Sequence, residues 1–248
     1  MRRTPFVAAV ATLALIGCDT PVVEPDLEVE PAFSHHAGDA AGSYRVTVYN
    51  LTSSQPFTPP LVATHSTAVR MFNVGQPASE GIQEIAENGN LGPLSDFLSG
   101  SDEVSDVVIA LGDPPPLLQG QSISFEIEAD GDARFLSWVS MLICTNDGFV
   151  GRNLVRLPAQ VGQTRTAYAR SYDAGTEINT EDFADIVPPC QIFGATSSDD
   201  AGTGMSNPDL AEDGRVLPHP GIMGGDDLVP ELHGWDEPAA MIEVERIG

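Results

Sequence analysis

Apolar and polar residues alternate with a period of two along residues 44–50, 122–128 and 241–246. A strand that turns one face to a core and the other to solvent produces this alternation. Residues 104–111 and 135–144 are more continuously apolar, which is typical of strands buried on both faces or in the core of a sandwich. The body of the chain is therefore predicted to be mainly β.

One stretch has the pattern of a helix instead. Ser79 is a good N-cap, Ile82 and Ile85 fall on one face, and Asn88-Gly89 favours a left-handed end. A second short helix is predicted over residues 93–98. Turn-forming Gly, Pro and Asp residues separate the strands at spacings typical of an antiparallel sandwich. We therefore expect an antiparallel β-sandwich with one or two short helices.

The beginning of the chain has the pattern of an export signal. Arg2 and Arg3 precede an uncharged stretch, residues 6–17, which is too short to span a bilayer comfortably and ends in small residues. Leu15-Ile16-Gly17-Cys18 also matches a bacterial lipobox, in which the cysteine becomes the lipid-modified first residue. The alternative is an ordinary secretory signal with a chance cysteine at position 18.

Three parts of the chain follow from this interpretation. Residues 1–17 are the lipoprotein signal peptide, and residues 18–42 are an acidic, Pro-rich tether that is poor in aromatic residues. Residues 43–248 form one folded domain, including a long Gly-, Asp- and Pro-rich loop region at residues 199–235. The predicted location is the bacterial cell envelope, lipid-anchored on the periplasmic side or at the surface, or a secreted form.

Charge narrows the set of partners. Without the leader, 9 of the 11 basic residues and all 36 acidic ones remain, a formal charge of −27, and every basic residue is Arg. Such a surface repels nucleic acid and anionic lipid and attracts cations. The absence of Lys also excludes a P-loop lysine, a Schiff-base lysine and a Ser-Lys dyad. We expect no nucleic acid partner and membrane contact only through the lipid anchor.

The remaining cysteines, Cys144 and Cys190, belong to a compartment that permits disulfides. A bridge between them is one possibility, and a buried free thiol at Cys144 is the other. Neither lies in a CxxC motif or beside the residues that activate a catalytic thiol.

Sequence motifs for catalysis are missing. The chain has no Gly-x-Ser-x-Gly elbow and no His-Glu-x-x-His helix. His65, His219 and His233 are scattered, which is more typical of structural or surface histidines. An envelope hydrolase with its site in the Gly/Asp-rich loop around His219 and His233 is the alternative function. It requires those histidines to converge with an acid and a nucleophile in a pocket.

Two acidic runs, residues 145–151 and 171–177, indicate cation binding and not catalysis. Each places an aspartate, Asp147 or Asp173, in a turn-forming stretch, as expected where loops at the end of a sheet offer carboxylates to a hard cation. The alternative is that both acids only cap turns. Bringing the two carboxylates together without a cation would cost like-charge repulsion.

Four segments in order resemble the spondin N-terminal (F-spondin) domain in its bacterial form. They are residues 75–89, residues 137–151 ending in Asn146-Asp147-Gly148-Phe149-Val150-Gly151, Tyr172-Asp173-Ala174-Gly175-Thr176-Glu177, and residues 238–246. Their order and spacing agree over roughly residues 44–247. The tryptophan-rich first strands and the thrombospondin repeats of the animal proteins are absent, and residues 199–235 have little to match.

The resemblance implies an antiparallel β-sandwich similar to C2 domains, with a divalent cation, usually Ca²⁺, held by acidic loop residues at one end. The metal ligands that it implies are Glu128, Asp147 and Asp173. It also implies a non-enzymatic adhesion or ligand-binding module at the envelope. We expect the partner to be an envelope or matrix protein or a polysaccharide.

Overall fold

The computed structural model describes residues 42–113, 115–188, 190, 202 and 205–248. The predicted signal peptide, Cys18 and nearly all of the predicted tether lie outside the described residues. The strands are β1 (Gly42–Asn50), β2 (Leu61–His65), β3 (Val104–Ile109), β4 (Ser122–Ala129), β5 (Phe135–Met141), β6 (Gly148–Arg156), β7 (Thr164–Asp173), β8 (Leu217–Pro218) and β9 (Ala240–Arg246). The helices are α1 (Glu80–Asn88), α2 (Gly92–Ser99), α4 (Pro230–His233) and the 3-10 turns η1 (Phe183–Asp185) and η2 (Pro208–Leu210).

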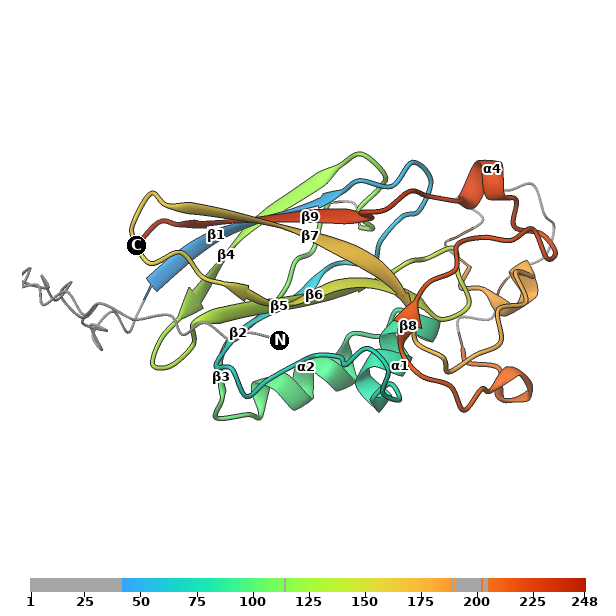
Figure 1. Ribbon diagram of the computed structural model, residues 1–248, viewed down its shortest axis with the longest axis horizontal. Coiled ribbons are helices and arrows are strands. Elements are labelled where there is room, and N and C mark those ends of the chain that lie inside the picture. Colours follow the sequence, from blue (N-terminus) through green and yellow to red (C-terminus); the bar gives the residue numbers. More distant parts are fainter. Residues whose placement is uncertain (1–41, 114, 189, 191–201, 203–204) are drawn as a thin grey trace, which may run out of the picture. The chain divides into compact units, whose positions relative to one another are not determined.

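The strands form one antiparallel path in the order β3-β2-β5-β6-β7-β9-β1-β4, and β8 adds to β7. The long strand β7 links the two halves, because residues 164–169 pair with β9 whereas residues 170–173 pair with β6. The halves face each other as two layers (Figure 1). The outer strands β3 and β4 come together, and Ser105 Oγ lies 2.8 Å from Asp130 Oδ1. The predicted mainly β, antiparallel sandwich is confirmed.

Strand β5 is buried on both faces, which explains its continuous apolar run. Leu136 and Trp138 belong to the core between the layers, whereas Val139 and Met141 belong to a second core beneath the helices. All four residues are fully buried. Burial of one such side chain stabilises the fold by about 1.5–3 kcal/mol. A central strand with two cores therefore anchors the neighbouring strands β2 and β6.

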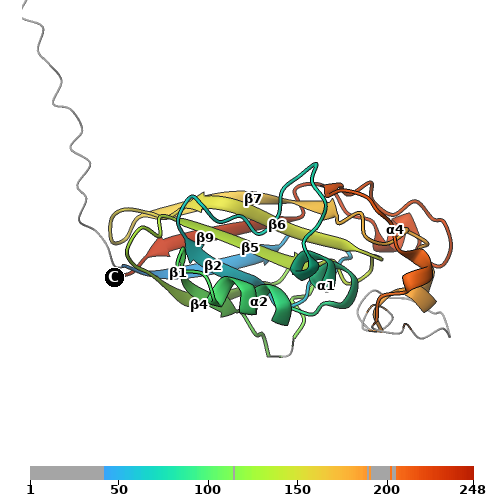
Figure 2. The same ribbon diagram turned by 90° about the horizontal axis from the view of Figure 1, so that it is seen from below.

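Helices α1 and α2 cover the outer face of the β5 and β6 layer (Figure 2). The Ser79 hydroxyl accepts the Ile82 N–H, and Gly89 ends α1 at a φ of 66°. Ile82 and Ile85 are fully buried against the sheet. The predicted start, face and end of this helix are confirmed. No helix in the described part of the chain is long and apolar enough to cross a bilayer.

Strands β2, β6 and β7 were not predicted from the sequence, and the short β8 lies in the predicted loop region. Strand β7 shows the reason most clearly: its sequence TRTAYARSYD carries alanine at two of its more buried positions, so the hydrophobic alternation is weak. Its place is decided by pairing with three neighbours, β6, β8 and β9. The two acidic runs lie where β6 begins and β7 ends.

Candidate functional site

Strand pairing brings Asp147 and Asp173 together. Gly148, the first residue of β6, pairs with Asp173, the last residue of β7. The Ala174 N–H then donates to the Asp147 carbonyl oxygen at 3.1 Å. Two acids 26 positions apart in the sequence therefore lie at one end of the sandwich, as the sequence predicted for the two runs.

Asp147 is fully buried and only half satisfied. Its Oδ2 accepts the N–H groups of Thr176 at 2.8 Å and Glu177 at 3.1 Å, and the Thr176 hydroxyl lies 3.3 Å away. Its Oδ1 is buried and has no hydrogen-bond partner among the described residues. Leaving a buried carboxylate oxygen unpaired costs free energy, so either a bound cation or a proton on the carboxyl would stabilise this atom.

The pKa of Asp147 is raised, as expected for a buried carboxyl with an unpaired oxygen. Burial, and then the nearby negative charge of Asp173, raise the pKa of Asp147 to about 7, against the opposing effect of the N–H donors of Thr176 and Glu177. A carboxyl that resists ionisation at neutral pH is a group that a positive charge would stabilise.

Asp173 is held in place by its own loop. Its Oδ1 accepts the Gly175 N–H at 2.7 Å, and its Oδ2 accepts an Asn179 side-chain N–H at 2.7 Å. Gly175 has a φ of 67°, and a Cβ there would clash with the backbone of Arg215. Each carboxylate oxygen has a second lone pair, so these bonds orient Asp173 without preventing it from binding a cation.

Two further acids surround the site and were not singled out from the sequence. Glu177 is buried, and burial, together with the charges of Glu87, Asp147 and Asp185, raises its pKa to about 7 although it accepts the Asn207 N–H. Glu181, at a φ of 61°, accepts the Met223 N–H at 2.6 Å and the Gly225 N–H.

The hydrogen bonds of Glu177 and Glu181 both reach residues 205–225, which lie far along the chain from these two acids. No local sequence pattern could have predicted either acid as part of the site.

Glu128 is not part of this cluster, which corrects the expected three-carboxylate set. It pairs with Ser43 in β1, whose hydroxyl it accepts at 2.9 Å. Following the register through β1 and β9 places it beyond Thr164, at the opposite end of β7 from Asp173. Nine residues of strand at about 3.3 Å each separate the two ends by roughly 30 Å.

The carboxyls near the site do not amount to a complete all-side-chain metal centre. Across the described residues, no group of three or more His, Cys, Asp and Glu side chains is arranged to hold a metal ion. Of the three expected ligands, the structure brings together Asp147, whose Oδ1 is unpaired among the described residues, and Asp173, whose charge acts on it. Such a centre would need backbone carbonyls and water for its remaining oxygen ligands.

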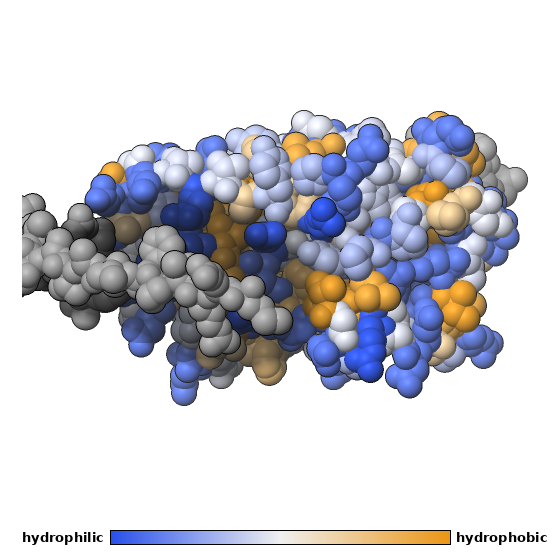
Figure 3. Space-filling model, in the orientation of Figure 1, coloured by the Kyte–Doolittle hydropathy of each residue, from blue (hydrophilic) through white to orange (hydrophobic). Residues whose placement is uncertain are grey.

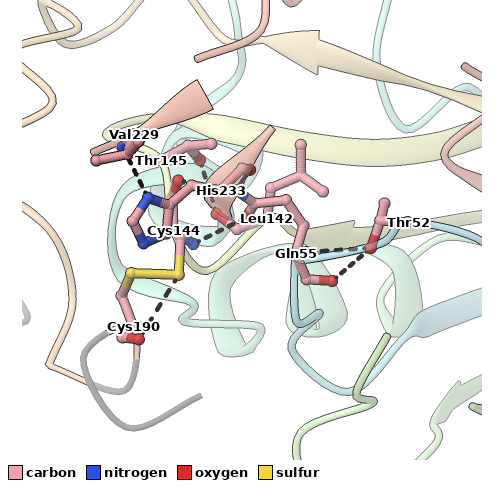
Figure 4. Close-up of a disulfide and its surroundings, with 8 residues drawn as sticks. All are labelled: Thr52, Gln55, Leu142, Cys144, Thr145, Cys190, Val229 and His233. Atoms are coloured by element: carbon pink, nitrogen blue, oxygen red, sulfur yellow. Dashed lines mark hydrogen bonds between the residues drawn. A yellow bond between two sulfur atoms is a disulfide. The ribbon is translucent and has the colours of Figure 1, made fainter. Parts of the chain in front are cut away.

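A disulfide fixes the loop that carries Asp147 (Figure 4). Cys144 and Cys190 are bonded with a Cα–Cα distance of 5.0 Å. The Gln55 side chain accepts the Cys144 N–H at 3.1 Å and donates to the carbonyl oxygens of Cys144 and His233. Four segments distant in sequence are thereby tied together next to the site.

The histidines of the hydrolase alternative are engaged in packing and hydrogen bonds. His219 packs on Trp235 with ring centroids 5.1 Å apart, and His233 packs on Phe183 at 6.0 Å. Each Nδ1 accepts a backbone N–H, from Gly221 and Val229 respectively. Burial lowers the pKa of His219 to about 4 despite the surrounding carboxylates.

The third histidine is also engaged. His65 is fully buried, and its Nε2 lies 2.7 Å from the Ser137 hydroxyl oxygen. This geometry does not favour a histidine-based hydrolase.

Comparison with known proteins identifies the family of the chain. No curated protein sequence matches it significantly. The family model described as Spondin_N matches residues 47–184, more than half of the chain. The match runs from β1 to η1 and includes Asp147 and Asp173. This family is generally non-catalytic and of extracellular type. The chain belongs to the Spondin_N family.

Proposed function

We propose that this protein is an exported, lipid-anchored and non-enzymatic binding module whose loop end is ordered by one Ca²⁺ ion. The observation that carries the proposal is the buried, unpartnered Oδ1 of Asp147 beside the carboxylate of Asp173. A cation there would satisfy the orphan oxygen and cancel the repulsion between the two acids.

Oxygen chemistry favours Ca²⁺ over a transition metal. The two residues that would hold the ion are both aspartates, and flexible Gly-containing turns next to them carry carbonyl groups. Hard cations take carboxylate, carbonyl and water oxygens, whereas Zn²⁺ takes His and Cys. Extracellular modules bind Ca²⁺ with a Kd of about 10⁻⁴ to 10⁻³ M, and we expect that range here.

The bound ion would supply positive charge that stiffens a recognition surface. The loop that follows Asp173 is hydrogen-bonded to residues 205–225 through Glu177 and Glu181. An ion that fixes this loop would therefore also stabilise the larger loop surface formed by residues 205–225. The partner that we propose is an envelope or matrix protein or a polysaccharide. Cys18 would hold the domain at the cell envelope, facing the periplasm or the outside.

Thermal unfolding in chelator and in calcium tests this proposal. The purified protein should lose melting temperature in EDTA and regain it in millimolar CaCl₂, and Mg²⁺ should restore less. Asp173→Asn should remove most of the calcium response, whereas the matched variant Glu126→Gln, at an exposed position of β4, should keep it. An equal melting temperature in EDTA and in calcium would refute the calcium site and leave the family assignment untouched.

A further inference from the structure

A separate cavity lies on the helical side of the molecule. It has a volume of about 370 Å³ and lies between residues 70–73, the start of α1 and helix α2. This volume is near the lower end of the range for small-molecule sites, about 300–1,000 Å³. Neither Asp147 nor Asp173 lines the cavity, so a ligand there would bind apart from the proposed calcium site.

The floor of the cavity is held rigidly. The Asn153 side chain of β6 accepts the Met71 N–H and donates to the Phe72 carbonyl oxygen, both at 2.9 Å. The Phe72 ring packs against both Phe149 and Tyr172, with centroids 5.1 and 4.9 Å away, and these two rings stack on each other at 5.4 Å. A floor that is fixed by the sheet before any ligand arrives lowers the entropic cost of binding.

Part of the wall is apolar, and one aromatic ring is left open to solvent. Leu94 and Met71 are buried at the cavity, whereas Phe97, on the exposed side of α2, is 71% exposed. An exposed phenylalanine at the mouth of a preformed pocket is suited to cover an apolar group that enters it. On the surface, apolar residues lie next to strongly hydrophilic ones over this helical layer (Figure 3).

The rim carries one charge of each sign. Arg70 and Glu80 both line the cavity. Arg70 donates from Nη1 to the carbonyl oxygens of Thr67 and Val69, at 3.0 and 3.5 Å. Neither Arg70 nor Glu80 forms a salt bridge with another side chain among the described residues.

We propose that this cavity binds a small zwitterion with an apolar body, of the class of the free apolar α-amino acids. Arg70 binds the ligand's carboxylate, Glu80 binds its ammonium group, and the side chain enters the space between Met71, Leu94 and Phe97. A ligand with one charge would pair with only one of these two exposed side chains, whereas a zwitterion would pair with both. The opposite charges therefore select the ligand class, and the cavity volume limits its size.

Calorimetric titration of the purified protein with L-phenylalanine and L-leucine tests the proposal. Phenylalanine has 12 non-hydrogen atoms, and at about 0.3 kcal/mol per atom its expected Kd is about 2 mM or tighter. Arg70→Gln and Glu80→Gln should each weaken binding at least tenfold, and Phe97→Ala should weaken it less. The matched variants Arg165→Gln and Glu126→Gln, in strands outside the cavity, should bind as the wild type does.

Singly charged analogues provide the sharper comparison. Phenylacetate lacks the ammonium group and phenethylamine lacks the carboxylate, so each should bind at least tenfold more weakly than phenylalanine. The proposal is overturned if phenylalanine and leucine show no saturable binding up to about 20 mM, if the analogues bind as tightly, or if the two control variants weaken binding equally. Melting curves of all variants show that any lost binding is not lost folding.

Discussion

Replacing Asp147 by asparagine should stabilise the calcium-free protein at alkaline pH. The side chain is fully buried, and its pKa of about 7 lies about three units above the ordinary value of 3.8. The unfolded chain therefore loses its proton near pH 4, whereas the folded protein keeps it until about pH 7. The folded state binds more protons in this window, so the carboxyl lowers the stability as the pH rises from about 4 to 7.

The size of the effect follows from the shift. Three pH units at 1.36 kcal/mol each give about 4 kcal/mol of destabilisation above pH 7 in the absence of calcium. An asparagine retains an oxygen for the N–H groups of Thr176 and Glu177, and its amide N–H₂ can donate toward Asp173. Asp147→Asn should thus be more stable than the wild type by up to about 4 kcal/mol at pH 8 and by little at pH 4.

Urea unfolding in EDTA at pH 4, 6 and 8 measures this difference. The comparison between variant and wild type is needed because other groups titrate in the same range. The pKa of His219 is lowered to about 4 by burial, which adds stability as the pH rises from 4 to 6.5, and Glu177 acts in the opposite sense. A difference between variant and wild type that is the same at pH 4 and pH 8 would refute the reasoning.

Three further predictions concern the frame around the site. Removing the disulfide with Cys144→Ser and Cys190→Ser releases a loop of 46 residues and should cost about 4 kcal/mol in urea unfolding, so an unchanged midpoint would contradict its structural role. Gly175→Ala should lower the melting temperature more than Gly162→Ala, since both glycines have positive φ but only at Gly175 does a Cβ meet backbone; equal losses would contradict this contact. Ile82→Ala should cost about 2–5 kcal/mol, and the partly buried Gln83→Ala should cost far less; a small loss for Ile82 would show that α1 does not anchor the second core.

The parts of the fold that could be predicted are those that local pattern decides. Residues 135–144 are apolar throughout because β5 faces two cores, and the alternation of residues 44–50 matches the buried and half-buried positions of β1. Ser79 and Gly89 mark α1 because capping depends on near neighbours in the sequence. Strand β7 was missed because it lacks a strongly apolar face of its own. Pairing with its neighbouring strands holds it in place.

The candidate site was predictable to the same extent. Asp147 and Asp173 stand in turn-forming runs, and their convergence needed only that β6 and β7 pair. Glu128 also ends a strand, but a sequence does not tell which end of the sheet that strand end will reach, and the register through β1 and β9 places it at the far one. Glu181 became visible only through its contacts with Met223 and Gly225.

The most direct test of the calcium site is a crystal structure of the calcium-loaded protein with anomalous difference density measured at long wavelength. We predict one peak within about 2.3–2.6 Å of Asp147 Oδ1 and of an Asp173 carboxylate oxygen, with the remaining ligands from backbone carbonyls and water. The same crystals soaked in chelator should lose the peak. Density at Glu128 instead, or no peak beside Asp147 in millimolar calcium, would contradict the account.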